Sequence, residues 1–95
     1  MTIIDFGNVN TMVKLYTTSD CPKCEKLAEF LTNKNISFKK YVIDKDPEAE
    51  TDALMDNVFS APALKKEGRI LRTRDIFKGD ALDYGKIMEF LKAEH

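Results

Sequence analysis

The chain has 95 residues, 43% of them hydrophobic and 33% charged, and its formal net charge is −1. This composition is typical of one globular domain near the lower size limit for a self-sufficient core, and it excludes disordered and fibrous chains. A charge so close to zero gives no general attraction to nucleic acid or anionic membrane, and no apolar run reaches the ~20 residues of a membrane span. The first residues lack the basic region of a signal peptide, so we expect a cytoplasmic protein.

Two strands joined by a helix are the first elements that the pattern predicts. Residues 13–17 alternate apolar and polar side chains and are rich in strand formers. A helix over residues 22–34 follows, opened by Pro22, with its buried face at helical spacing: Cys24, Leu27, Ala28 and Leu31. Residues 38–43 predict a second strand, parallel to the first in a βαβ unit.

The second half of the chain predicts a helix, a hairpin and a last helix. Residues 47–57 carry acids in their first turn, where the helix dipole favours them. Residues 61–71 predict a hairpin that turns near Glu67 and Gly68. The resulting order is β-α-β-α-β-β-α, which is an α/β arrangement within one domain over residues 12–95.

The two ends of the chain are predicted from shorter sequence patterns. Asp80 and Asp83 are spaced as a capping pair for the last helix, whose apolar face would be Tyr84, Ile87, Met88 and Leu91. Residues 1–11 are interpreted as an N-terminal extension, which could form an edge strand, cover apolar surface, or simply precede the domain.

The only two cysteines, Cys21 and Cys24, stand in a Cys-Pro-Lys-Cys motif. A disulfide that closes so short a loop adds little stability, so we expect the two cysteines to have a chemical rather than a stabilising role. At a helix start the unpaired N–H groups and the dipole favour a thiolate, most strongly at the outermost cysteine. We therefore expect Cys21 to attack a disulfide and Cys24 to resolve the product, with Pro22 and Lys23 tuning the thiolate.

Other interpretations of this pair remain open. The cysteines could be an inert packed pair, although Pro22 at the helix start argues against burying both. They could also be half of a zinc or iron–sulfur site shared between two chains, since His95 is the only other soft ligand. A pure interaction module would bind its partner whatever the state of the cysteines. A Cys-x-x-Cys within a βαβ unit favours redox chemistry.

A second feature points to the same chemistry. Ala61-Pro62 precedes the strand that would lie beside the βαβ unit, which places Pro62 opposite the cysteines. We predict a cis peptide bond between these two residues. The backbone of Ala61 would then be available to pair with an extended substrate segment as an added strand.

The motif Val13-Lys14-Leu15-Tyr16-Thr17-Thr18-Ser19-Asp20-Cys21-Pro22-Lys23-Cys24, together with Ser60-Ala61-Pro62, resembles a dithiol glutaredoxin over residues 12–93. The resemblance implies a thioredoxin-like fold, a four-stranded mixed sheet flanked by helices. It also implies Cys21 as nucleophile, Cys24 as resolving cysteine and Pro62 as cis-proline. Ser60-Ala61-Pro62 is similar, too, to the thioredoxin-like glutaredoxins that donate electrons to ribonucleotide reductase and are themselves reduced by a flavoprotein.

The sequence departs from the family where glutathione would bind. Thr18 stands where glutaredoxins usually carry a Lys or Arg for a glutathione carboxylate. The Gly-Gly pair and its following acids are replaced by Arg72-Thr73-Arg74-Asp75, of which Asp75 alone matches. The predicted substrate-binding residues are therefore Thr18, Ala61, Pro62, Arg72, Thr73, Arg74 and Asp75. Glutathione becomes one possible reductant beside a flavoprotein or ferredoxin-linked reductase.

Charge is segregated along the chain. Residues 65–78 hold six cations against two acids, a net +4, while residues 44–56 hold six acids and one lysine, a net −5. The basic stretch could dock an acidic partner, or Arg72 or Arg74 could bind a carboxylate, or the stretch could simply be solvated.

The sequence thus predicts a monomeric thiol–disulfide oxidoreductase that needs no metal or organic cofactor. Its partners would be disulfide-containing protein clients and a reductase or glutathione.

Overall fold

The computed structural model describes residues 13–92, so the predicted extension over residues 1–11 and His95 lie outside the described residues. None of the helices within residues 13–92 has the length and apolar content that crossing a bilayer would require. The elements in chain order are β1 (Val13–Thr17), α2 (Pro22–Asn33), β2 (Phe38–Val42), α3 (Pro47–Met55), β3 (Ala63–Lys66), β4 (Arg69–Leu71), α4 (Thr73–Ile76), β5 (Phe77–Lys78), β6 (Ala81–Leu82) and α5 (Tyr84–Lys92).

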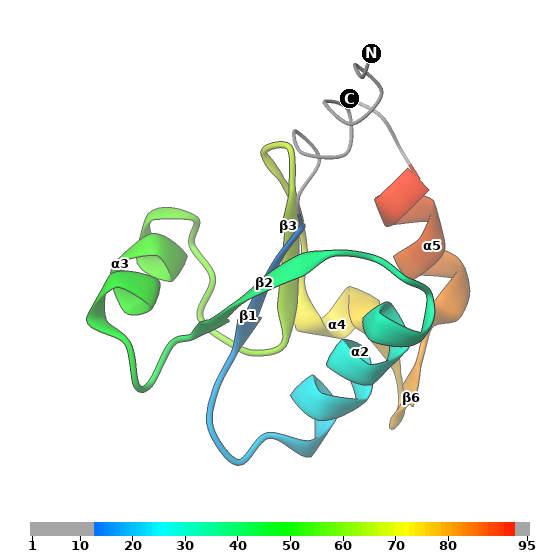
Figure 1. Cartoon of the computed structure of the whole chain (residues 1–95), viewed down its shortest axis with the longest axis horizontal. Coiled ribbons are helices and arrows are strands. Elements are labelled where there is room, and N and C mark those ends of the chain that lie inside the picture. Colours follow the sequence, from blue (N-terminus) through cyan, green and yellow to red (C-terminus); the bar gives the residue numbers. More distant parts are fainter. Residues whose placement is uncertain (1–12, 93–95) are drawn as a thin grey trace.

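One mixed sheet organises the domain, with strand order β2-β1-β3-β4 (Figure 1). β1 pairs in parallel with β2 and antiparallel with β3, and β3 pairs antiparallel with β4. The four-stranded sheet confirms the predicted α/β architecture. Because β1 is central and leads directly into α2, the loop between them emerges at one edge of the sheet.

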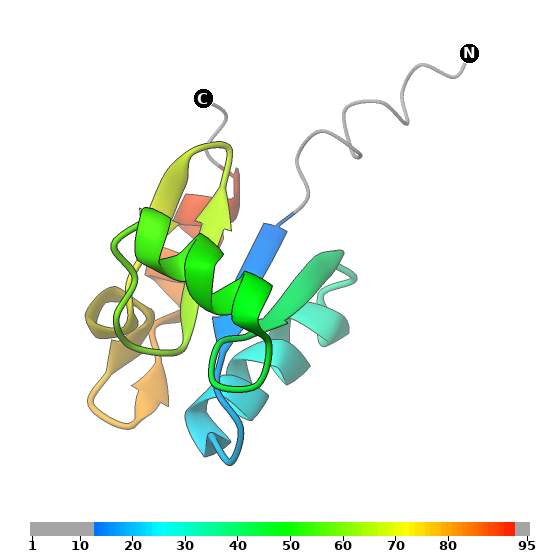
Figure 2. The same cartoon turned by 90° about the vertical axis from the view of Figure 1, so that its left-hand side faces the viewer.

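Helices cover both faces of this sheet, with α3 on one face and α2 and α5 on the other (Figures 1 and 2). Side chains alternate along β1: Leu15 joins the core beneath α2 and α5, whereas Tyr16 joins the core beneath α3. The α2 and α5 face holds the larger cluster, which includes Leu27, Leu31, Leu64, Ile76 and Ile87, all fully buried.

The β3–β4 hairpin turns at Glu67 and Gly68, as predicted. Both residues have positive φ, 51° and 80°, which is the backbone conformation that a two-residue hairpin turn requires. Only glycine adopts this conformation without a steric penalty, so Gly68 suits its position.

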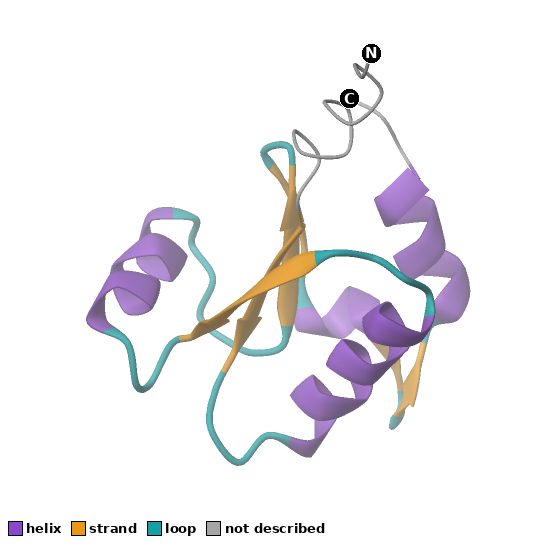
Figure 3. Cartoon of the chain, viewed as in Figure 1, coloured by secondary structure: helices purple, strands orange, loops and turns teal. Residues whose placement is uncertain are grey.

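The connection between β4 and α5 contains elements that the sequence did not predict, namely the short helix α4 and the β5–β6 ribbon (Figure 3). Asp80 lies in the turn of this ribbon, so its prediction as part of a capping pair was wrong. Asp83 caps α5, because its Oδ1 accepts a hydrogen bond from the Lys86 N–H at 3.1 Å. Tyr84, which was predicted on the apolar face of this helix, is 56% exposed, and its ring packs against Phe30 at 5.2 Å between centroids.

Candidate active site

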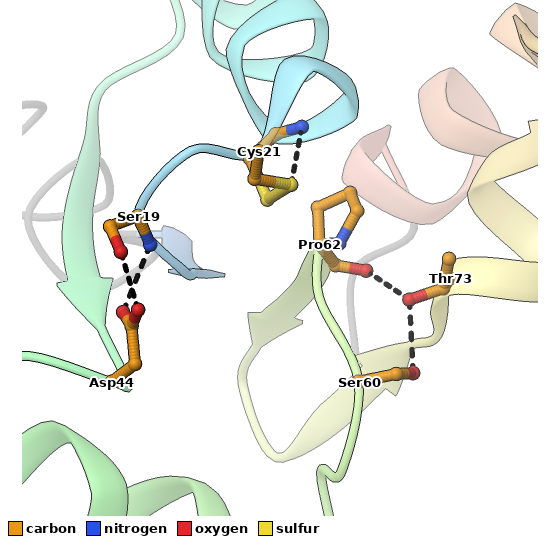
Figure 4. The surroundings of a disulfide bond; sticks show 7 residues. Ser19, Cys21, Asp44, Ser60, Pro62 and Thr73 are labelled. Atoms are coloured by element: carbon orange, nitrogen blue, oxygen red, sulfur yellow. Dashed lines mark hydrogen bonds between the residues drawn. A yellow bond between two sulfur atoms is a disulfide. The ribbon is translucent and has the colours of Figure 1, made fainter.

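The two cysteines meet at the start of α2 and form a disulfide, with their Cα atoms 5.2 Å apart (Figure 4). Cys21 is the N-cap residue, with extended backbone, and Pro22 is the first helical residue. The Cys21 Sγ accepts a hydrogen bond from the Cys24 N–H at 3.1 Å. The cap therefore uses a sulfur in place of the usual hydroxyl or carboxylate oxygen.

The two cysteines differ in exposure. Cys24 is only 3% exposed, whereas Cys21 is half-buried, and both line one surface cavity. In the reduced protein, the N–H donor and the positive end of the helix would stabilise negative charge on Cys21. Lys23 extends over the Phe77 ring, with its Nζ 5.1 Å from the ring centroid, so this side chain also packs on the domain.

The loop before Cys21 is anchored to the loop that follows the neighbouring strand β2. Asp44 accepts hydrogen bonds from the Ser19 Oγ at 2.5 Å and from the Ser19 N–H at 2.9 Å (Figure 4). These two bonds, the side-chain one first, lower the pKa of the Asp44 carboxyl from its ordinary value. Asp20, next in the chain, has a φ of 52°. The sequence offered no signal for this contact, which joins residues 25 positions apart.

The peptide bond between Ala61 and Pro62 is cis, as predicted. Pro62 is fully buried, and Figure 4 shows its ring on the side of the Cys21–Cys24 disulfide. The segment that carries the cis bond runs from the end of α3 to the start of β3 and passes below the disulfide in this view.

Two of the predicted substrate-binding residues, Thr73 and Arg72, form hydrogen bonds to the segment around the cis-proline. The Thr73 Oγ1 donates to the Pro62 carbonyl at 2.7 Å and lies 3.2 Å from the Ser60 Oγ (Figure 4). A hydroxyl has one proton, so Ser60 must be the donor in the second bond. The Arg72 Nη1 donates to the Asn57 carbonyl at 2.6 Å. Both side chains therefore bond to backbone or side-chain oxygens of the segment that leads into Pro62.

Most of the basic stretch is engaged within the domain. Lys65 forms an ion pair with Asp56 at 2.8 Å, and Lys66 donates to the Leu91 carbonyl. Arg69 donates to the Phe90 carbonyl at 3.3 Å and lies over the Phe90 ring. Together with Arg72, four of the six cations contact other parts of the chain, and the other two, Arg74 and Lys78, are exposed.

Two surface cavities lie at this site and share Thr18. The cavity beside the cysteines measures about 280 Å³ and is lined by Thr17, Thr18, Ser19, Asp20, Cys21, Cys24, Glu25, Lys40 and Val42. The second, about 180 Å³, lies against α3 and includes Ser60 and Ala61 among its lining residues. Thr18 and Ala61 thus line the site, whereas Asp75 faces Lys86 at 3.7 Å and Arg74 is exposed. Within residues 13–92, no three His, Cys, Asp or Glu side chains gather as a metal site would need.

Comparison with known proteins agrees with this geometry. The glutaredoxin family model matches residues 13–71. A glutaredoxin-like 8.6 kDa protein in the rubredoxin operon of Clostridium pasteurianum is 34% identical over 61 residues, which cover 63% of this chain and 81% of that protein. A probable glutaredoxin from Synechocystis is 39% identical over 41 residues, 43% of this chain and 47% of that protein.

Solved structures extend the likeness to the fold. A crystal structure of a thioredoxin-like protein superimposes with a TM-score of 0.66 at 24% identity, covering 81% of this chain and 96% of that one. The structure of a glutaredoxin from Archaeoglobus fulgidus gives a TM-score of 0.64 at 21% identity, covering 98% of this chain and 97% of that one. Both likenesses show a thioredoxin-like fold.

Proposed function

Because the chain belongs to the glutaredoxin family and is a thiol–disulfide oxidoreductase with a redox-active Cys-x-x-Cys pair, we propose that it reduces disulfides of client proteins by dithiol exchange. The observation that carries the proposal is the unequal exposure of the two cysteines at the start of α2. Both line the same surface cavity, but Cys21 is half-buried whereas Cys24 is only 3% exposed. The reducing cytoplasm is the compartment in which such a dithiol would work.

In the first step the Cys21 thiolate attacks one sulfur of the client disulfide. The Cys21–client bond forms as the client S–S bond breaks, and the departing client sulfur leaves as a thiolate that takes up a proton. The Cys24 N–H and the helix start favour the attacking thiolate. The exposure of Cys21 gives the client sulfur its path of approach.

In the second step Cys24 loses its proton and attacks the Cys21 sulfur. The Cys21–Cys24 disulfide forms, the second client sulfur leaves as a thiol, and two electrons have passed to the client. The disulfide of the structure is thus the product state of the cycle. Two glutathione molecules or one dithiol reductase would return it to the dithiol.

The surroundings of the site favour a reductase as the electron source. Thr18 offers no cation to a glutathione carboxylate, and Arg72, which could have replaced one, bonds to the Asn57 carbonyl. Asp75, the remaining candidate for the glutathione amine, faces Lys86. A flavoprotein or ferredoxin-linked reductase is therefore the second half of the proposal, and ribonucleotide reductase is one client class that such an electron donor serves.

A trapping experiment tests the cysteine roles. With an oxidised model protein such as insulin, the Cys24→Ser variant should accumulate a mixed disulfide through Cys21, while Cys21→Ser should neither trap nor reduce. Mass spectrometry of the quenched reaction identifies the linked peptide. A mixed disulfide through Cys24 in the Cys21→Ser variant, at the same rate, would contradict the proposed roles.

A second experiment tests the electron source. The oxidised protein is mixed with glutathione at millimolar concentration or with a thioredoxin-type flavoprotein reductase and its pyridine nucleotide, and the appearance of free thiols is followed. We expect the reductase to act faster. Rapid reduction by glutathione alone would overturn this half of the proposal and leave the dithiol mechanism intact.

A further inference from the structure

An apolar hollow lies beside the redox site, between α3 and the segment that leads into the cis-proline. It measures about 180 Å³ and is lined by Thr18, Ile43, Glu50, Ala53, Leu54, Val58, Phe59, Ser60 and Ala61. Glu50 is the single charged residue of this lining. The hollow is not used by the chemistry of the two cysteines.

Two large apolar side chains at this hollow are exposed to solvent. Phe59 is 77% exposed and Leu54 is 54% exposed. Single exposed apolar residues are normal on protein surfaces, but these two line the same cavity. Met55, also 77% exposed, lines a different cavity on α3 with Pro47, Glu48, Thr51 and Asp52.

The hollow is continuous with the place where a client must be attached. Thr18 lines both this hollow and the cavity that contains Cys21. Ser60 and Ala61 line it as well, and they come immediately before the buried Pro62, whose ring lies on the side of the disulfide (Figure 4). A polypeptide joined to Cys21 through its own cysteine would therefore have its neighbouring residues close to the hollow.

We propose that the hollow receives one apolar side chain of the protein client, from an extended segment that carries the client cysteine. This inference rests on the proposed reduction of protein disulfides and adds the class of client. A cavity of about 150 Å³ accommodates a benzene ring, so this one has room for a leucine or phenylalanine side chain. Side chains two residues apart lie on the same face of an extended strand, which makes the second residue from the client cysteine the one to test.

The charge at the hollow also limits which client segments can bind there. Glu50 is the charged residue of the lining, and it stands in the first turn of α3. Like charges repel across such a rim, so acidic groups of a client are disfavoured there. The client segment is thus apolar and free of acidic residues near its cysteine, which also makes glutathione, with two carboxylates, a poor occupant.

Two disulfide peptides test the proposal. They are identical except that one carries leucine two residues before and two residues after its cysteine, and the other carries serine at both positions. We expect the wild-type protein to reduce the leucine peptide with about tenfold higher kcat/KM, equivalent to about 1.4 kcal/mol. Phe59→Ala and Leu54→Ala should lower this ratio to about two or less, and Met55→Ala should keep it near ten.

Each outcome is decisive. Two results would contradict binding of a client side chain in the hollow and leave disulfide reduction unaffected. One is equal reduction of both peptides by the wild-type protein. The other is a Met55→Ala variant that lowers the ratio as far as Phe59→Ala does. Failure to reduce either peptide or any small disulfide would instead overturn the proposed function itself. Sedimentation adds a check: a wild-type dimer that Phe59→Ala dissociates would assign the hollow to a second copy of this chain, against the proposal.

Discussion

The two faces of the sheet are held by different forces. Under α2 and α5 the core is apolar and mostly aliphatic, with Leu15, Leu27 and Leu64 fully buried. Under α3 the apolar cluster consists of Tyr16, Ala53, Val58 and Ala63, which are mostly smaller. Polar contacts supplement that cluster: the Tyr16 hydroxyl donates to Asp56 at 2.8 Å, and Asp56 pairs with Lys65.

This difference separates the chemistry from the surroundings of the client. The cysteines stand on α2, which is fixed by apolar burial that does not titrate. The helix α3 and the hollow beside it depend partly on groups that do titrate. We therefore expect pH and salt to affect the α3 face first and the α2 face last. Four substitutions follow, beginning with the largest expected effect, and those at Asp56 and Tyr16 test the dependence on pH.

Truncation of the aliphatic core should have the largest effect. Leu27→Ala removes a fully buried side chain from α2 and leaves a cavity beneath it, which should cost about 2–5 kcal/mol in the free energy of unfolding. Urea denaturation followed by circular dichroism measures this cost. The exposed Leu54→Ala on α3 is the matched control, with a cost below about 1 kcal/mol. Similar losses in the two variants would contradict the contrast between the faces.

Removal of the Asp56 charge should come next. Hydrogen bonds from Lys65, followed by the one from Tyr16, hold the pKa of the Asp56 carboxyl below its ordinary value of 3.8, against the opposing effect of burial. The ionised carboxylate therefore stabilises the fold above this pH, and the contribution is lost as pH falls through the lowered pKa.

Asp56→Asn should consequently cost about 1–2 kcal/mol at pH 7 for this half-buried ion pair and flatten the fall in stability as pH drops through and below 3.8. Urea midpoints at several pH values measure both effects. If the variant lost stability at low pH to the same extent as the wild-type protein, Asp56 would not contribute to that loss.

The hydroxyl of Tyr16 should have a somewhat smaller effect. Burial, followed by the hydrogen bond to Asp56, raises the pKa of Tyr16 above its ordinary value of 10.0. The neutral phenol stabilises the fold below this pH, and the contribution is lost as pH rises through the raised pKa. Tyr16→Phe should cost about 1 kcal/mol at pH 7 and weaken the loss of stability above pH 10. Thermal unfolding at pH 7 and pH 11 distinguishes the loss of the hydroxyl from a simple packing defect. A packing defect would lower the unfolding temperature by the same amount at both pH values.

The smallest effect on stability is expected at Thr73, where the consequence falls on activity. Thr73→Val keeps the shape but removes the hydrogen bonds to Pro62 and Ser60, at a cost of about 1 kcal/mol or less. A less firmly held cis-proline segment should raise KM for a protein disulfide several-fold with little change in kcat. Thr73→Ser, which retains the hydroxyl, should restore the wild-type KM. A variant pair with equal KM values would assign Thr73 a purely structural role.

The helices and strands whose apolar residues recur with a clear periodicity could be predicted from the sequence, and those without such a periodicity could not. β1 and α2 follow from alternation and from Cys24, Leu27 and Leu31 at helical spacing. The strands β5 and β6 have two residues each, too few to show any period. Asp80 was therefore assigned to the next helix, although it lies in the turn between these strands.

For the site, local chemistry could be predicted and long-range partners could not. The cysteine pair and the cis bond at Pro62 follow from residues adjacent in the chain. The contact between Ser19 and Asp44, and that between Arg72 and Asn57, depend on how distant segments come together. A cation in the sequence can bind a ligand or a backbone carbonyl equally well, so the bond from Arg72 to the Asn57 carbonyl could not be predicted.

The hairpin cations that contact α5 have a consequence for how the domain opens. Lys66 and Arg69 donate to the carbonyls of Leu91 and Phe90, which belong to the last turn of that helix. The terminal turns of a helix are usually the first to fray. Here fraying must also break the contacts to β3 and β4. The amides of the last turn of α5 should therefore exchange their hydrogens together with those of the hairpin, as one cooperative unit.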